Sequence, residues 1–283
     1  MPLARFAGFG DAGAMNVSPP RAAAGDRASW KAVAIPSEHG GWGLTLEPVL
    51  LGLLVAPSIA GLALGLAALL AFLVRTPLKL ALVDVRRERW LARSALASKV
   101  AASELSLIAG LVVLVVVRSG WAWTVPVLVA APLVCVQLWF DVRSRGRRLL
   151  PELCGAVGMA GTVATIVIAA GKGRPLAAAA WLVLAARSVG AIPFVRVQIV
   201  RLRRGAGSSR ASDIAQVVAI LIAAAGAVVA HRLLLGAMGI VALAGLQVVW
   251  VRKAPTVAKV LGMRQMALGF GLVALAATGV MMK

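Results

Sequence analysis

The sequence contains no tyrosine, two cysteines, two histidines and only ten acidic residues in 283. Two cysteines that are not spaced as a redox or metal-binding pair exclude a disulfide framework. Charged residues of both signs make up only 14% of the chain, whereas 61% of it is hydrophobic and the mean hydropathy is +0.93. A soluble core of this size could not bury so much apolar surface. The composition therefore predicts an integral membrane protein.

Long apolar runs fill the chain after its first thirty residues. Runs of this length cross a hydrocarbon core of roughly 30 Å, and they lack the alternation of strands, so we expect helices. The sequence predicts an all-α membrane protein with about nine spans: 43–60, 61–80, 101–118, 121–140, 151–171, 175–195, 213–230, 232–250 and 264–282. Residues 1–30 are rich in Ala, Gly, Pro and Arg and are expected to be a disordered tail. Residues 31–283 then form one polytopic membrane domain.

The basic residues lie almost entirely on one side of these spans. With the N-terminus inside, 25 of the 30 Lys and Arg residues fall in cytoplasmic segments and 5 fall outside. This asymmetry follows the positive-inside rule, so the net charge of +20 indicates topology and not nucleic-acid binding. The C-terminus is expected outside. All ten acids also fall on the cytoplasmic side, which topology does not require, and this indicates a polar cavity that faces the cytoplasm.

The stretch "IPSEHGGWGLTLEPVLLGLL" places polar groups where the first span begins. Glu38 and His39 precede glycines that allow close approach of another segment, and histidine titrates near neutral pH. Glu47 lies about one turn inside the span, where an ionisable group is costly. It either lines the cavity or pairs with a neighbouring arginine. Trp42 lies near the expected membrane boundary, as interfacial tryptophans do.

A second group of polar residues follows the second span in "RTPLKLALVDVRRERW". Arg75 and Lys79 are four residues apart, as are Asp84 and Glu88, so each pair is expected to share a helix face. Pro77 is expected to bend or end the span, and the next segment resembles an interfacial helix. Asp84 and Glu88 could hold a divalent cation against a phosphate, or they could pair with the neighbouring arginines 86, 87 and 89.

Two later segments are mainly basic. "FDVRSRGRRLLPELCG" contains Asp141 and Arg143, and "ARSVGAIPFVRV" contains Arg187 and Arg196 in or beside the sixth span. An arginine kept only for topology would be costly there, whereas guanidinium groups bind phosphate through two parallel hydrogen bonds. We therefore expect Arg187 and Arg196 to contact a phosphate.

The segments "PSEHGGWG", "RTPLKLALVD" and "ARSVGAIPFVRV" resemble the YwiC-like family of bacterial membrane proteins. More remotely, the chain resembles the UbiA superfamily of membrane prenyltransferases. This resemblance implies a nine-helix bundle, a cytoplasm-facing cavity and a place in the bacterial inner membrane. Only Asp84-x-x-x-Glu88 matches the second half of the first aspartate signature of that superfamily. Its second signature is absent, since no acid occurs between Glu152 and Asp213.

Two functions follow from these patterns. The first is a UbiA-like transferase that acts on a membrane lipid or isoprenoid phosphate, with Mg²⁺ held by Asp84 and Glu88. Acid–base chemistry would then come from Glu38, His39 and Glu47, and substrate contacts from Trp42, Arg75, Lys79, Asp141, Arg143, Arg187 and Arg196. The second is a non-catalytic protein that binds or transports a lipid or small anion and has lost the metal–diphosphate site. No nucleic-acid partner and no particular oligomeric state are predicted.

Overall fold

The structure, a computed structural model, describes residues 39–88 and 92–282. These residues form helices and turns without a strand, which confirms the all-α membrane fold. The helices are α2 (His39–Val55), α3 (Ile59–Arg86), α4 (Ala92–Ser119), α5 (Thr124–Val142), α6 (Leu149–Ala160), α7 (Thr162–Ala169), α8 (Arg174–Arg204), α9 (Arg210–Val229), the 3₁₀ turn η1 (His231–Leu233), α10 (Leu234–Trp250) and α11 (Ala258–Met281). The expected tail, residues 1–30, lies outside the described residues, as does Glu38.

Within the described chain, eight helical segments are long and apolar enough to cross a membrane. Two of them are joined from shorter pieces, because α6 and α7 together form the segment 149–169 and η1 leads directly into α10. The shorter apolar helix α2 is the ninth member of the bundle. Nine spans were expected, and eight described segments are long and apolar enough to be spans, whereas α2 is shorter.

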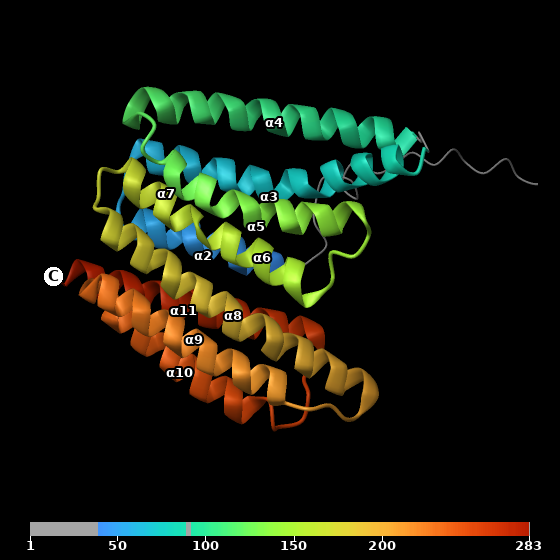
Figure 1. Cartoon of the computed structure of the whole chain (residues 1–283), viewed down its shortest axis with the longest axis vertical. Coiled ribbons are helices and arrows are strands. Elements are labelled where there is room, and N and C mark those ends of the chain that lie inside the picture. Colours follow the sequence, from blue (N-terminus) through green and yellow to red (C-terminus); the bar gives the residue numbers. More distant parts are fainter. Residues whose placement is uncertain (1–38, 89–91, 283) are drawn as a thin grey trace, which may run out of the picture.

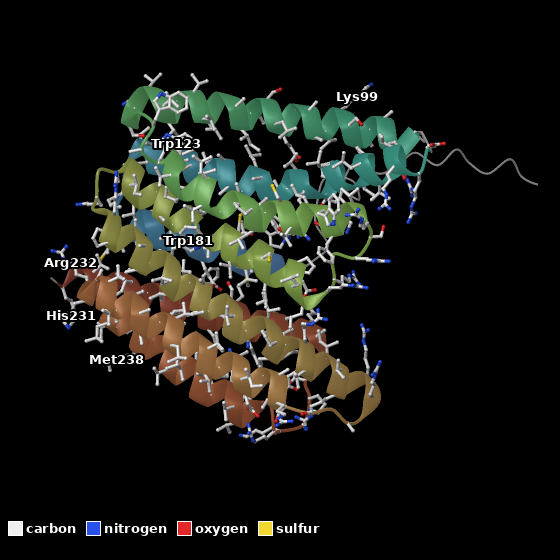
Figure 2. All side chains as sticks on the ribbon, in the orientation of Figure 1. Lys99, Trp123, Trp181, His231, Arg232 and Met238 are labelled. Atoms are coloured by element: carbon white, nitrogen blue, oxygen red, sulfur yellow. The ribbon has the colours of Figure 1, made fainter. Side chains whose placement is uncertain are left out.

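The helices run up and down, so successive connections alternate between two ends of the bundle (Figure 1). One end contains the turns after α3, α5, α8 and α10, where most of the described arginines and lysines lie. We call it the basic end. In Figure 2, Lys99 lies in the half of α4 nearer the basic end, whereas His231 and Arg232 mark the opposite end. Each described acid except Glu47, which lies at the middle of α2, is nearer the basic end of its helix than the opposite end or lies within the turn there.

The largest apolar core surrounds α8. Small residues of α8, including Ala177, Ala180 and Val183, are almost completely buried against α7, α9 and α11. Small side chains allow helices to approach closely, which is the main source of packing energy between helices in lipid. The bundle outside this core exposes large apolar residues such as Val117 and Val228, as expected of surfaces that face lipid.

The spacing Gly61-x-x-x-Gly65 in α3 brings this helix close to its neighbours in the same chain. A Cβ atom on Gly61 would lie 2.9 Å from Ile166 of α7, and one on Gly65 would lie 2.7 Å from Val49 of α2. Both distances are shorter than an ordinary carbon contact. Because these two positions lack a side chain, α3 can pack closely against α2 and α7.

The expected end of the second span was wrong. Pro77 lies inside α3, which continues to Arg86, and α4 begins at Ala92 instead of near residue 101. No separate interfacial helix forms in the described part of this segment. Each of these 28-residue helices is about 42 Å long, longer than the roughly 30 Å hydrocarbon core, so charged residues extend beyond it at the basic end. Leu- and Ala-rich sequence on both sides of Pro77 favours continued helix despite the lost N–H.

Candidate functional site

Five helices each contribute one polar side chain to a network inside the bundle. The members are Glu47 of α2, Arg187 of α8, Gln216 of α9, Gln247 of α10 and Gln265 of α11. Each residue exposes 8% or less of its surface. Buried polar groups are stable when they find partners, so this network fixes how the five helices pack. We call it the central polar network.

Arg187 lies at the centre of the central polar network. Its Nη1 donates to the side-chain Oε1 of Gln265 at 3.0 Å, and its Nη2 donates to the backbone carbonyl of the same residue at 2.6 Å. Nη2 also lies 3.8 Å from Oε1 of Glu47. At that distance the two groups form an ion pair but not a hydrogen bond. Arg187 is therefore held mainly by Gln265, while Glu47 supplies the opposite charge.

Two further glutamines extend the network toward α9 and α10. Gln247 donates from Nε2 to Oε1 of Gln265 at 3.4 Å, and Gln216 donates from Nε2 to Oε1 of Gln247 at 2.9 Å. Gln216 also donates to the backbone carbonyl of Gly190 at 3.0 Å. The result is a continuous line of hydrogen bonds from α9 to the guanidinium group on α8.

Helix α11 approaches Glu47 closely because position 269 is glycine. A Cβ atom built on Gly269 would collide with the Glu47 carboxyl group. On the same pair of helices, a Cβ on Gly43 would lie 3.4 Å from the side chain of Met266. Glycine therefore makes room for a buried carboxyl group between α2 and α11.

Two buried donors of the central polar network have no acceptor among the described residues. They are Nε of Arg187 and Nε2 of Gln265. A small cavity of about 10 Å³, near the lower limit for holding one water molecule, adjoins Arg187, Gly190, Gln216 and Gln247. Two unpaired donors, one of them on an arginine, are suited to a ligand that accepts hydrogen bonds and carries negative charge.

A second polar cluster joins α3 to α5. Arg75 donates from Nε to Oδ2 of Asp141 at 2.8 Å and from Nη2 to Oδ1 at 3.3 Å, while Nζ of Lys79 lies 3.8 Å from Oδ1. With its amide turned so that the oxygen faces Arg75, Gln137 accepts from Nη2 at 3.0 Å. The Asp141 side chain is only 1% exposed, whereas Arg75 is 27% exposed and Lys79 41%. Arg75 and Lys79 thus share one face, as expected, and neutralise a buried aspartate.

Two glycines of "FDVRSRGRRLLPELCG" leave room for side chains of the second cluster. A Cβ atom on Gly146 would collide with the Asp141 carboxylate, and one on Gly155 would collide with the Gln137 amide. The turn after α5 and the helix α6 can close over the second cluster only because both positions lack a side chain.

The expected carboxylate pair of Asp84 and Glu88 does not share a helix face. Asp84 is buried near the end of α3, where it accepts from Ser94 Oγ at 2.7 Å and from Nη2 of Arg93 at 3.2 Å. Glu88 lies beyond the helix end, exposed and with a φ of 54°. The expected spacing fails because α3 ends at Arg86. Across the described ranges, no group of three or more His, Cys, Asp or Glu residues is arranged to hold a metal ion.

The remaining sequence-predicted residues lie along the basic half of the bundle. Trp42 packs edge-on against Phe72 of α3, with 5.2 Å between ring centroids. Arg143 stacks over Trp139 at 3.4 Å, and Arg196 pairs with Glu152 at 2.8 Å. Glu38 and the side chain of His39 lie outside the described residues, although His39 begins α2. Glu47 and Arg187 pair with each other, whereas Arg75 pairs with Asp141 and Asp84 with Arg93.

Sequence reasoning missed the three glutamines of the central polar network. Gln216, Gln247 and Gln265 each lie in an otherwise apolar expected span. A polar amide is costly there unless it has a partner, so the sequence alone could have marked these glutamines as residues with buried partners. Only the fold shows that the three amides meet one another and Arg187.

No curated protein and no solved structure matches this chain. Residues 35–169, which run from the segment before α2 to the end of α7, match a family described as YwiC-like protein. The chain's resemblance to the YwiC-like family is thereby confirmed over residues 35–169.

Proposed function

We propose that this membrane protein binds a small anion in the central polar network and carries it across the membrane. The observation that carries the proposal is the pair of buried donors, Nε of Arg187 and Nε2 of Gln265, which find no acceptor in the part of the chain that the structure describes. A buried donor without an acceptor costs about 1–3 kcal/mol. An anion placed between these two groups would remove that cost and add charge-assisted hydrogen bonds.

The charges of the network allow an arriving anion to replace the Glu47 carboxylate beside Arg187. Arg187 has one carboxylate nearby, Glu47 at 3.8 Å, and no closer anionic partner among the described residues. An arriving anion can therefore compete with Glu47 for the guanidinium group. Both charged groups are buried, so each needs the other when no ligand is bound. Glu47 acts in this proposal as a built-in counter-ion that the substrate replaces.

The size of the site restricts the substrate. The adjoining cavity of about 10 Å³ is lined by polar, small and large apolar residues of α8, α9 and α10, with Ile240 and Leu243 as the large apolar ones. A ligand much larger than one or two heavy atoms could enter only if these helices moved apart. We therefore propose a small monovalent anion such as chloride as the substrate class.

The test uses the purified full chain in proteoliposomes loaded with a potassium salt. Efflux of chloride after addition of valinomycin should exceed that of empty vesicles. Arg187→Gln should abolish this efflux, and Gln265→Leu should reduce it. The matched control is Arg252→Gln, which breaks an exposed ion pair with Asp213 (3.0 Å) at the basic end. Equal efflux from Arg187→Gln and the control would refute the proposal.

The UbiA-like transferase remains a second proposal for the same chain. It needs Asp84 to release Arg93 and Ser94 before this carboxylate can bind Mg²⁺. It also needs Glu88 to turn toward Asp84 from its position beyond the end of α3. The anion proposal requires no such rearrangement, and for this reason we place it first.

A further inference from the structure

A hollow of about 200 Å³ opens at the basic end, away from the central polar network. It lies between the start of α6, the second half of α8 and the start of α9. Its apolar lining includes Leu149, Pro193, Val197, Val200 and Ala211. Along α8, Arg196 is nine residues beyond Arg187, or about 13 Å. The hollow is therefore a separate feature from the proposed anion site.

Arg196 is the charged residue of this hollow. Its Nη1 donates to Oε2 of Glu152 at 2.8 Å and to the backbone carbonyl of Arg147 at 3.0 Å. Its Nε and Nη2 make no hydrogen bond to the described residues, and the side chain is 39% exposed. One edge of the guanidinium group is thus fixed by the protein, while the other edge is free to bind a phosphate.

The surroundings of the hollow are strongly positive. Four more arginines follow Arg196 at the end of α8 and the start of α9: Arg201, Arg203, Arg204 and Arg210. None of the four is in an ion pair with a described carboxylate. The nearest acids in the sequence are Glu152, already paired with Arg196, and Asp213, already paired with Arg252. This surface has a net positive charge and no free counter-ion.

We propose that the hollow binds an anionic phospholipid of the membrane leaflet at the basic end. The phosphate contacts the free edge of Arg196, and the start of an acyl chain fills the apolar hollow. Two observations favour a lipid over a soluble phosphate. The lining is almost entirely apolar, and large apolar residues beside it, Leu150 and Leu202, are exposed as on a surface that faces lipid.

The test is native mass spectrometry of the full chain after incubation with three probes. They are phosphatidylglycerol, phosphatidylcholine with the same acyl chains, and inorganic phosphate. The unmodified chain should retain phosphatidylglycerol roughly tenfold better than phosphatidylcholine, because the choline cation is repelled by the arginines around the hollow. Arg196→Gln should remove this preference. Val200→Trp, at a position that is 42% exposed, should fill the hollow and lower retention of both lipids.

The matched control is Arg93→Gln, which breaks an ion pair of an exposed arginine with Asp84 (3.2 Å) at the same end, on α4. This variant should keep the preference for phosphatidylglycerol. If Arg196→Gln and Arg93→Gln behave alike, the proposed site is wrong. Binding of inorganic phosphate that depends on Arg196 but not on Val200 would also overturn the lipid assignment. Because Val200 is exposed, its variant tests the proposal even if Arg196→Gln fails to fold.

Discussion

Glu47 of α2 and Arg187 of α8 lie 3.8 Å apart inside the bundle, and each exposes 3% or less of its surface. The two residues are 140 positions apart in the sequence. They form an ion pair between the part of the chain that matches the YwiC-like family and the helix that follows it. This pair holds the two parts together and provides the charge of the proposed anion site.

Removing either member of this pair should destabilise the protein more than removing both. Arg187→Gln leaves Glu47 as a buried carboxylate without a counter-ion, which typically costs about 3–5 kcal/mol. The double variant Glu47→Gln/Arg187→Gln contains no uncompensated charge, so it should recover a large part of that loss. Thermal unfolding of the four proteins in detergent measures the coupling. Strictly additive losses would mean that the two charges do not interact.

Asp84→Asn separates the two proposed functions. The amide keeps the shape of Asp84 and can still accept from Ser94 Oγ, but it loses the charge that faces Arg93. If the protein is an anion carrier, efflux from proteoliposomes should stay close to that of the unmodified chain, with or without EDTA. If it is a Mg²⁺-dependent transferase, the Asp84→Asn substitution and the addition of EDTA should each abolish its activity. Loss of anion efflux with EDTA would contradict the carrier proposal.

Gly155→Ala should destabilise the bundle, because a Cβ at this position collides with the Gln137 amide that faces Arg75. Overpacking of this kind typically costs about 1–3 kcal/mol. Gly245→Ala is the matched control, since it also lies inside a helix but has open space around its Cβ. That variant should be neutral or slightly more stable. The measurement is the midpoint of thermal unfolding, and equal midpoints for the two variants would refute the packing argument.

The orientation in the membrane remains a prediction of the charge distribution. With 25 of 30 basic residues assigned to the cytoplasmic side, the basic end should face the cytoplasm. Lys283 should then be outside. Alkaline phosphatase fused after Lys283, which is active only outside the cytoplasm, should be active, and a fluorescent reporter that folds only in the cytoplasm should be dark. The opposite result would reverse the orientation and place the proposed lipid site in the outer leaflet.

The sequence by itself determined the class of the protein and eight of its spans, because hydrocarbon thickness sets the length of each apolar run. It also determined that Arg75 and Lys79 share a face, since helical spacing is local. The same local rule failed for Asp84 and Glu88, because it holds only while the helix continues and α3 ends between them.

Only the tertiary structure decided which buried groups become partners. From the sequence, Glu47 could either line a cavity or pair with a neighbouring arginine. Its partner in the structure, Arg187, comes from a distant helix. Gln216, Gln247 and Gln265 are three isolated amides along the chain, yet they form one line of hydrogen bonds in the bundle. Local patterns cannot specify such partners, because they depend on the rotation and depth of each helix against its neighbours. Those are set by contacts among small residues, such as Gly269 beside Glu47.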